Sequence, residues 1–258
     1  MRGGAGATRV RVMRSSIDDV LTDLIAEYDR IETFLTMLTD EQWKAPSAAP
    51  GWSVADTVLH LAQSEGGVAA TLETPTSTWT TRDHPLDDAI EAQVRASSLA
   101  PGEVFEHWKV ARRSSVAALA AADPSVTVRW AAAPLKPRTL ATTRLAEHWA
   151  HALDITEPLG IDYPDTDRLR HVAWLGHATL PYAMRLAGLT SPTVLCTLTS
   201  PGGTVMTYGP PDATAKISGS MGAFCRVGAR RLGADESGLL ANGPVALAAL
   251  QVLRNYAV

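Results

Sequence analysis

The chain has 258 residues, of which 46% are hydrophobic and 19% are charged, a composition typical of a folded globular protein rather than a disordered one. Its formal net charge is −4, so it lacks the positive excess expected of proteins that bind nucleic acid or an anionic membrane. Small molecules or other proteins remain as its expected partners.

Cys196 and Cys225 are the only cysteines, and no C-x-x-C pair occurs, which argues against a disulfide framework and a thiolate zinc site. Residues 1–16 are basic without an apolar run, so we expect a terminal extension rather than a secretory signal. The uncharged run 186–211 contains prolines and adjacent glycines, which exclude a membrane helix. We therefore interpret the protein as cytoplasmic.

Hydrophobic periodicity predicts a helix bundle in the first part of the chain. In the clearest segment, apolar residues recur at helical spacing from Ile17 to Leu38. Ser53 and Asp56 form a capping pattern at the start of a second helix. Pro101 marks a point where the third predicted helix can be interrupted. The four long helices are expected over residues 16–38, 53–73, 86–122 and 142–160. Helices of these lengths and connections describe a four-helix bundle.

Beyond residue 165 the pattern becomes mixed. After one more helix, two β-rich runs separated by proline and two glycines predict a hairpin, and a third strand and two helices follow. The helices are expected over 166–188, 221–231 and 244–256, and the strands over 193–200, 204–209 and 213–218. The predicted fold class is α+β, mostly α, with a bundle over 14–160 and a smaller α+β domain over 165–258. We expect the substrate entrance between these domains, where small-molecule sites are common.

The fourth predicted helix carries Glu147, His151 and Asp154 on one face, at i, i+4 and i+7. Side chains four residues apart have Cβ atoms about 5–6 Å apart, so Glu147 and His151 can share one divalent ion. A third ligand must come from another helix, and His60 in the second helix is the best candidate. Asp154 is placed to accept a hydrogen bond from His151.

Spacing alone does not establish a metal site. Glu147 also shares its side of the helix with Arg144 and His148, and polar stripes of this kind are usually solvated. His148 is an alternative to His151 as a ligand. On this pattern by itself, a solvated face is the favoured interpretation.

Two segments resemble a known family. "GWSVADTVLHLAQ" and, some ninety residues later, "RLAEHWAHALDI" are similar to the mycothiol-dependent maleylpyruvate isomerase family, within the wider DinB-like superfamily of four-helix metalloproteins. The resemblance covers residues 14–160 and extends more loosely beyond them. It implies a DinB-like bundle in which His60, Glu147 and His151 bind a divalent ion, which we expect to be zinc. It also implies mycothiol as the thiol cofactor.

The implied ligand set suits catalysis, because two imidazoles and one carboxylate leave open coordination positions. A thiol bound there loses its proton. Cys196 and Cys225 are expected in buried structural positions, so the thiol is external. Arg226, Arg230 and Arg231 form a cationic cluster that can bind substrate carboxylates, although a solvated helix end explains them equally well. The family's isomerase has an essential arginine in this domain, which does not align to one residue here.

The predicted function is thiol-dependent isomerisation or conjugation of a small electrophilic substrate, with isomerase and S-transferase chemistry both open. Two alternatives stay open. The first is a thiol-independent, metal-dependent isomerase, lyase or hydrolase that uses water in the open position. The second is a metal-binding protein without catalysis. A homodimer is also left open.

Overall fold

The computed structural model describes residues 11–12, 16–73, 86–130, 133–190 and 193–256. Residues 16–163 form one compact unit, and residues 164–256 form the other together with residues 11–12; the two are described separately below. Helices predominate, and a small sheet follows the bundle in the chain, in agreement with the predicted α+β, mostly α fold class. Among the helices of these described ranges, none is both long and apolar enough to cross a membrane.

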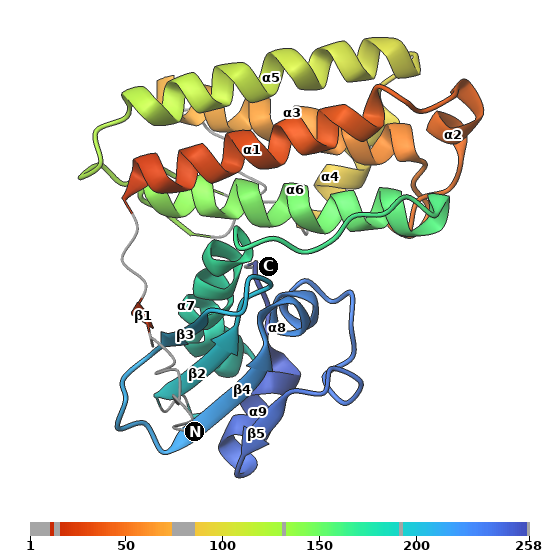
Figure 1. Cartoon of the computed structure of the whole chain (residues 1–258). Helices are drawn as coiled ribbons and strands as arrows, with labels where there is room; N and C mark the ends of the chain where they lie inside the picture. The colour runs from red at the N-terminus through yellow and green to blue at the C-terminus, as the bar shows by residue number, and fades with distance from the viewer. Residues whose placement is uncertain (1–10, 13–15, 74–85, 131–132, 191–192, 257–258) are drawn as a thin grey trace, which may run out of the picture. The chain divides into compact units, whose positions relative to one another are not determined.

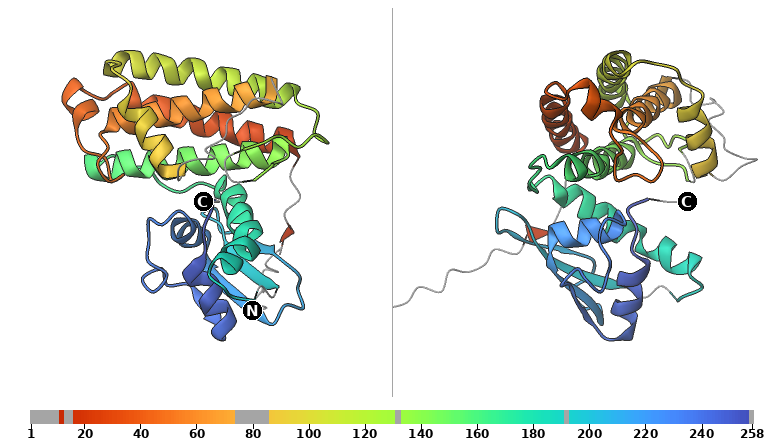
Figure 2. Two further views of the ribbon diagram at one scale, coloured as in Figure 1. Left: turned by 180° about the vertical axis from the view of Figure 1, so that it is seen from behind. Right: turned by 90° about the vertical axis from the view of Figure 1, so that its right-hand side faces the viewer.

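The first unit is a four-helix bundle, which the right-hand view of Figure 2 shows nearly end-on. Its described helices are α1 (Ile17–Leu35), α2 (Asp40–Lys44), α3 (Val54–Glu73), α4 (Leu86–Arg95), α5 (Pro101–Ala121) and α6 (Pro137–Leu159). The long helices α1, α3, α5 and α6 run alongside one another (Figure 1). Contacts are most extensive between α3 and α5 and between α1 and α6, so the bundle consists of two tightly packed pairs. Helices α3 and α6 belong to different pairs and contact each other less.

The predicted capping pattern at the start of α3 is present. The Ser53 hydroxyl accepts a hydrogen bond from the Asp56 amide at 3.1 Å, and the Asp56 carboxylate accepts from the Ser53 amide at 2.9 Å. Both bonds satisfy amides that the first turn of a helix leaves without partners. This cap fixes where α3 begins, and thereby which face His60 occupies.

The C-terminal end of α6 is shaped by Pro158, which lies inside the last turn. Because proline has no N–H, the carbonyl of Asp154, four residues earlier, loses its ordinary helical partner. The amide of Ala48, in the connection before α3, donates to that carbonyl at 2.8 Å. Gly160 then ends the helix in the left-handed conformation, at φ 65°.

The first predicted helix ends at Leu35 rather than residue 38, and the predicted helix over 86–122 is two helices, α4 and α5. Pro101 occupies the first turn of α5, where its missing N–H costs nothing. The five-residue helix α2 was not predicted, although Thr39 and Gln42 form a capping box. The loop predicted over 74–85 lies outside the described residues.

The second unit is a five-stranded sheet with helices against it (Figure 1). Its elements are β1 (Arg11–Val12), α7 (Leu169–Leu186), β2 (Val194–Thr199), β3 (Val205–Tyr208), β4 (Ala215–Ser220), α8 (Met221–Gly228), β5 (Leu240–Asn242) and α9 (Pro244–Val252). The strand order is β1-β3-β2-β4-β5, and β2 and β3 form the predicted antiparallel hairpin. The N-terminal segment, expected to be only an extension, instead supplies β1, which pairs in parallel with β3.

One face of this sheet is buried. The alternating residues of β2, β3 and β4 that share this face are paired in register, as Cys196 is with both Tyr208 and Ile217. Helices α7, α8 and α9 contact the strands. Alternation of this kind is typical of a sheet with one face against helices and the other toward solvent.

Candidate metal centre

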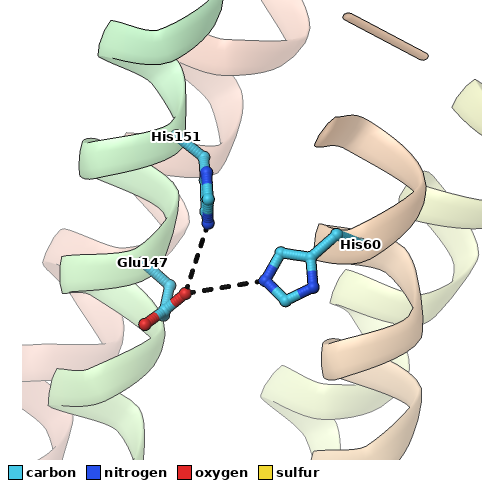
Figure 3. A group of neighbouring side chains, drawn as sticks. All are labelled: His60, Glu147 and His151. Carbon is cyan, nitrogen blue, oxygen red and sulfur yellow. Dashed lines mark ion pairs between the residues drawn. The ribbon is translucent and has the colours of Figure 1, made fainter. Parts of the chain in front are cut away.

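Two helices of the bundle bring His60, Glu147 and His151 together, with His60 on α3 and the other two on α6 (Figure 3). The Glu147 carboxylate lies between the two imidazoles. Its Oε2 atom is 3.7 Å from His60 Nε2 and 3.5 Å from His151 Nε2. One ligand atom of each residue lies within 4.8 Å of those of the others, so the three predicted ligands face a common point.

These separations fit a divalent ion. Two ligand atoms that each lie about 2.1 Å from a tetrahedral ion are about 3.4 Å apart. The separations of 3.5 and 3.7 Å from Glu147 Oε2 to the two imidazole nitrogens are close to this value. Nitrogen and carboxylate oxygen are also the donor atoms that zinc accepts. The arrangement can therefore hold an ion with small adjustments of the side chains.

The protonation states of Glu147 and His60 also suit an ion. Burial acts to raise the pKa of Glu147, but the His151 and His60 imidazoles outweigh it and hold this pKa well below its ordinary value. Burial lowers the pKa of His60. At neutral pH the cluster thus presents an ionised carboxylate and a neutral His60, which are the forms that bind metals.

Asp154 orients His151 from the next turn of α6. Its Oδ2 atom lies 2.9 Å from His151 Nδ1, and the Asp154 side chain is buried. A carboxylate can only accept a hydrogen bond, so the proton of a neutral His151 is on Nδ1 and the lone pair is on Nε2, the atom that faces Glu147. Burial acts to lower the pKa of His151, but hydrogen bonds with Asp154 and Glu147 outweigh it and raise this pKa.

His148 is not available as an alternative ligand. It is completely buried, and the Trp108 indole donates a hydrogen bond to its Nε2 at 3.1 Å. Its Nδ1 is 3.0 Å from the Arg144 carbonyl, so the neutral ring donates there. Burial lowers the pKa of His148 to about 3. The expectation that Arg144 and His148 belong to a solvated stripe is therefore wrong, because both side chains are buried.

Trp52 forms one wall of the centre, a position that the sequence did not indicate. Its ring centroid is 5.2 Å from that of His60 and 6.4 Å from that of His151, and the latter rings are stacked. The indole N–H donates to Glu91 on α4, and Arg95 binds the same carboxylate at 2.7 Å. Trp52 directly precedes Ser53, the cap of the helix that carries His60, and this adjacency is the signal from which its place could have been found.

The remaining predicted site residues belong to the C-terminal unit. Arg230 and Arg231 follow α8 and line a surface hollow of about 590 Å³, whereas Arg226 forms an ion pair with Asp165 at 2.6 Å. Arg230 is exposed and has a positive φ of 59°. A role for Arg230 and Arg231 in substrate binding stays a prediction.

Both cysteines are buried, as expected. Cys196 lies in β2 and Cys225 in α8, and neither forms a disulfide. Burial raises the pKa of Cys196 to about 12 and that of Cys225 well above its ordinary value. Thiols in this state are poor nucleophiles, because the thiolate is the reactive form.

Comparison with known proteins identifies relatives of both the sequence and the fold. Residues 24–156 match the model of the family described as mycothiol maleylpyruvate isomerase N-terminal domain. Two uncharacterized proteins of Mycobacterium tuberculosis, from strains CDC 1551 / Oshkosh and H37Rv, are each 32% identical over 212 residues, which is 80% of this chain and 82% of theirs.

Solved structures of a mycothiol-dependent maleylpyruvate isomerase share the fold. The crystal structure of that enzyme aligns with a TM-score of 0.61 at 17% identity, and a histidine-to-alanine mutant of it with 0.60 at 16%. Each alignment covers 88% of this chain and 93% of the other. From its sequence match across the helix bundle, this chain belongs to the mycothiol maleylpyruvate isomerase N-terminal domain family.

Proposed function

We propose that this protein is a metal-dependent enzyme that uses mycothiol to isomerise or conjugate a small electrophilic substrate. The observation that carries the proposal is the convergence of His60, Glu147 and His151 at ion-binding distances inside a bundle of this family. The similarity in fold to a mycothiol-dependent maleylpyruvate isomerase supports it and supplies the identity of the thiol. Maleylpyruvate itself is one candidate substrate.

The chain's own residues prepare the site for an incoming anion. A divalent ion bound there supplies an open coordination position at which the pKa of a thiol falls. His60 and His151 are neutral ligands in their metal-binding forms, and Glu147 contributes one negative charge, so the loaded site keeps a net positive charge. Trp52 closes one side of the two imidazoles, which restricts the direction from which thiol and substrate can approach.

The nucleophile in this proposal comes from outside the chain. Cys196 and Cys225 are both buried and their pKa values are raised, so neither supplies a thiolate. An external low-molecular-weight thiol fills this role. For a substrate that carries a carboxylate, Arg230 and Arg231 are the candidate binding groups, because guanidinium binds carboxylate through paired hydrogen bonds.

Metal analysis of purified variants tests the ligand assignment. We expect the wild-type protein to hold one zinc ion per chain, and His60→Ala and His151→Ala to lose it. His107→Ala is the matched control, because His107 is exposed on α5 and is not part of the cluster. Full zinc occupancy in both ligand variants would disprove the assignment.

Turnover with and without mycothiol tests the reaction class. The proposal requires that activity on maleylpyruvate or a related electrophile depend on added mycothiol and on bound metal together. Activity that persists unchanged without the thiol would replace this proposal with a water-using or thiol-independent metal enzyme. Metal binding without any turnover would indicate a binding protein.

A further inference from the structure

A buried ion pair links α3 to α6 beside the metal centre. The Arg144 guanidinium on α6 donates from Nε to Glu65 Oε1 at 2.8 Å and from Nη2 to the Ser64 hydroxyl at 2.6 Å. The side chains of Arg144 and Glu65 are 3% and 0% exposed. The pair is therefore an interior feature of the bundle and not a surface salt bridge.

The position of this pair along the helices matches that of the candidate ligands. Ser64 lies one turn after His60 on α3, whereas Arg144 lies about one turn before Glu147 on α6. A step forward along α3 thus corresponds to a step backward along α6, as in antiparallel helices. The contact between His60 and Glu147 and the contact of Arg144 with Ser64 and Glu65 form two successive links between the same helices.

Helices α3 and α6 contact each other less than each contacts its main partner. Helix α3 packs mainly against α5, and α6 mainly against α1, so α3 and α6 meet at the boundary between the two helix pairs. The metal centre needs a defined separation at this boundary, because its ligands come from both helices. The planar Arg144 guanidinium bonds two neighbouring residues of α3 at once, so it constrains both the spacing and the register of α3 against α6.

Stability alone does not account for the pair. Replacing a buried ion pair by apolar residues of similar volume is often neutral or stabilising. Here the environment of Glu65 is also incomplete, because its Oε2 atom has no hydrogen bond of ordinary geometry among the described residues. Partly satisfied buried polar groups are costly.

We infer that Arg144, Glu65 and Ser64 form a positioning link that holds α3 and α6 at the distance at which His60, Glu147 and His151 bind one ion. None of the three is a ligand. This inference rests on the proposed function, because it concerns the same metal centre. It assigns to Arg144 an effect on metal affinity that is separate from its effect on folding.

The test replaces the link by an apolar pair of similar volume, in Glu65→Leu/Arg144→Met. Zinc dissociation constants are measured by competition with a chromophoric chelator, and the stability of the zinc-free protein by urea unfolding. We expect the double variant to remain folded, with unchanged or greater stability, and to bind zinc about tenfold more weakly, as for losses of residues that orient ligands.

Arg112→Met is the matched control. Arg112 is also a nearly buried arginine between the helix pairs, since it links α5 to Asp29 and Glu32 on α1, and within the described residues none of its ion pairs reaches α6. This variant should lose stability and keep the wild-type zinc affinity. A loss of zinc affinity equal to that of the double variant would show a general effect of bundle stability and overturn the inference.

The outcomes separate this inference from the proposed function. If the wild-type protein binds no zinc, the proposed function fails. If the wild type binds zinc and the folded double variant binds it equally well, only the positioning role fails. Should the double variant not fold, Ser64→Ala decides, because it removes one bond of the link and leaves the ion pair intact. A wild-type zinc affinity in Ser64→Ala would then overturn the inference.

Discussion

His148 should make the folded protein sensitive to mild acid. In the folded state its Nε2 accepts from Trp108 and its pKa is lowered to about 3, whereas histidine in an unfolded chain has a pKa of about 6.5. Between these values the unfolded chain binds a proton that the folded chain does not, so stability falls as the pH falls. From neutral pH to about pH 5 the loss is about 1.4 kcal/mol per pH unit over about 1.5 units, or about 2 kcal/mol.

Urea unfolding of the metal-free protein, with chelator present, measures this loss at the two pH values. His148→Gln is the comparison, because its amide provides an acceptor and a donor but does not take up a proton in this range. Other titrating groups are common to both proteins, so the difference between their pH dependences isolates His148. Between neutral pH and about pH 5, the free energy of unfolding of the wild type should fall by about 2 kcal/mol more than that of the variant. Equal losses in the two proteins would show that His148 does not stay neutral in the folded state.

Two further predictions concern the centre and the cysteines. Asp154→Asn should weaken zinc binding about tenfold, because a neutral amide accepts a weaker hydrogen bond from His151 Nδ1 than a carboxylate does. The chelator competition assay measures it, and an unchanged affinity would contradict the orienting role. Cys196→Ala and Cys225→Ala should keep normal mycothiol-dependent turnover per folded molecule, since both thiols are buried. Loss of turnover in a folded cysteine variant would point to a nucleophile within the chain.

The bundle was predictable because its long helices each have an apolar face of their own. In α1, for instance, the buried residues recur at helical spacing from Val20 to Leu35. The strands β1 and β5 were not predicted, since they contain two and three residues and gain their structure only by pairing with β3 and β4. Such short segments have no periodicity to recognise.

The proximity of the three candidate ligands was predictable in part. Glu147 and His151 are related by helical spacing, which the sequence shows directly, whereas His60 was only a candidate on another helix until the family resemblance joined it to them. The buried ion pair between Arg144 and Glu65 could not be predicted from the sequence. Charged residues are rarely buried, and whether a helix face is solvated depends on which helix packs against it. The sequence order does not contain that information for α3 and α6.

Pro158 places an unusual constraint on which residues can vary near the metal centre. The bond from the Ala48 amide to the Asp154 carbonyl joins two main-chain atoms, so it does not restrict the side chains at those positions. It depends instead on position 158, where any residue with an N–H would compete for the same carbonyl. The connection that leads to Trp52 is thus tied to α6 by the absence of a donor in the last turn of that helix. Exchange of this single proline would weaken the attachment of the connection that carries Trp52, although His60, Glu147 and His151 themselves stayed the same.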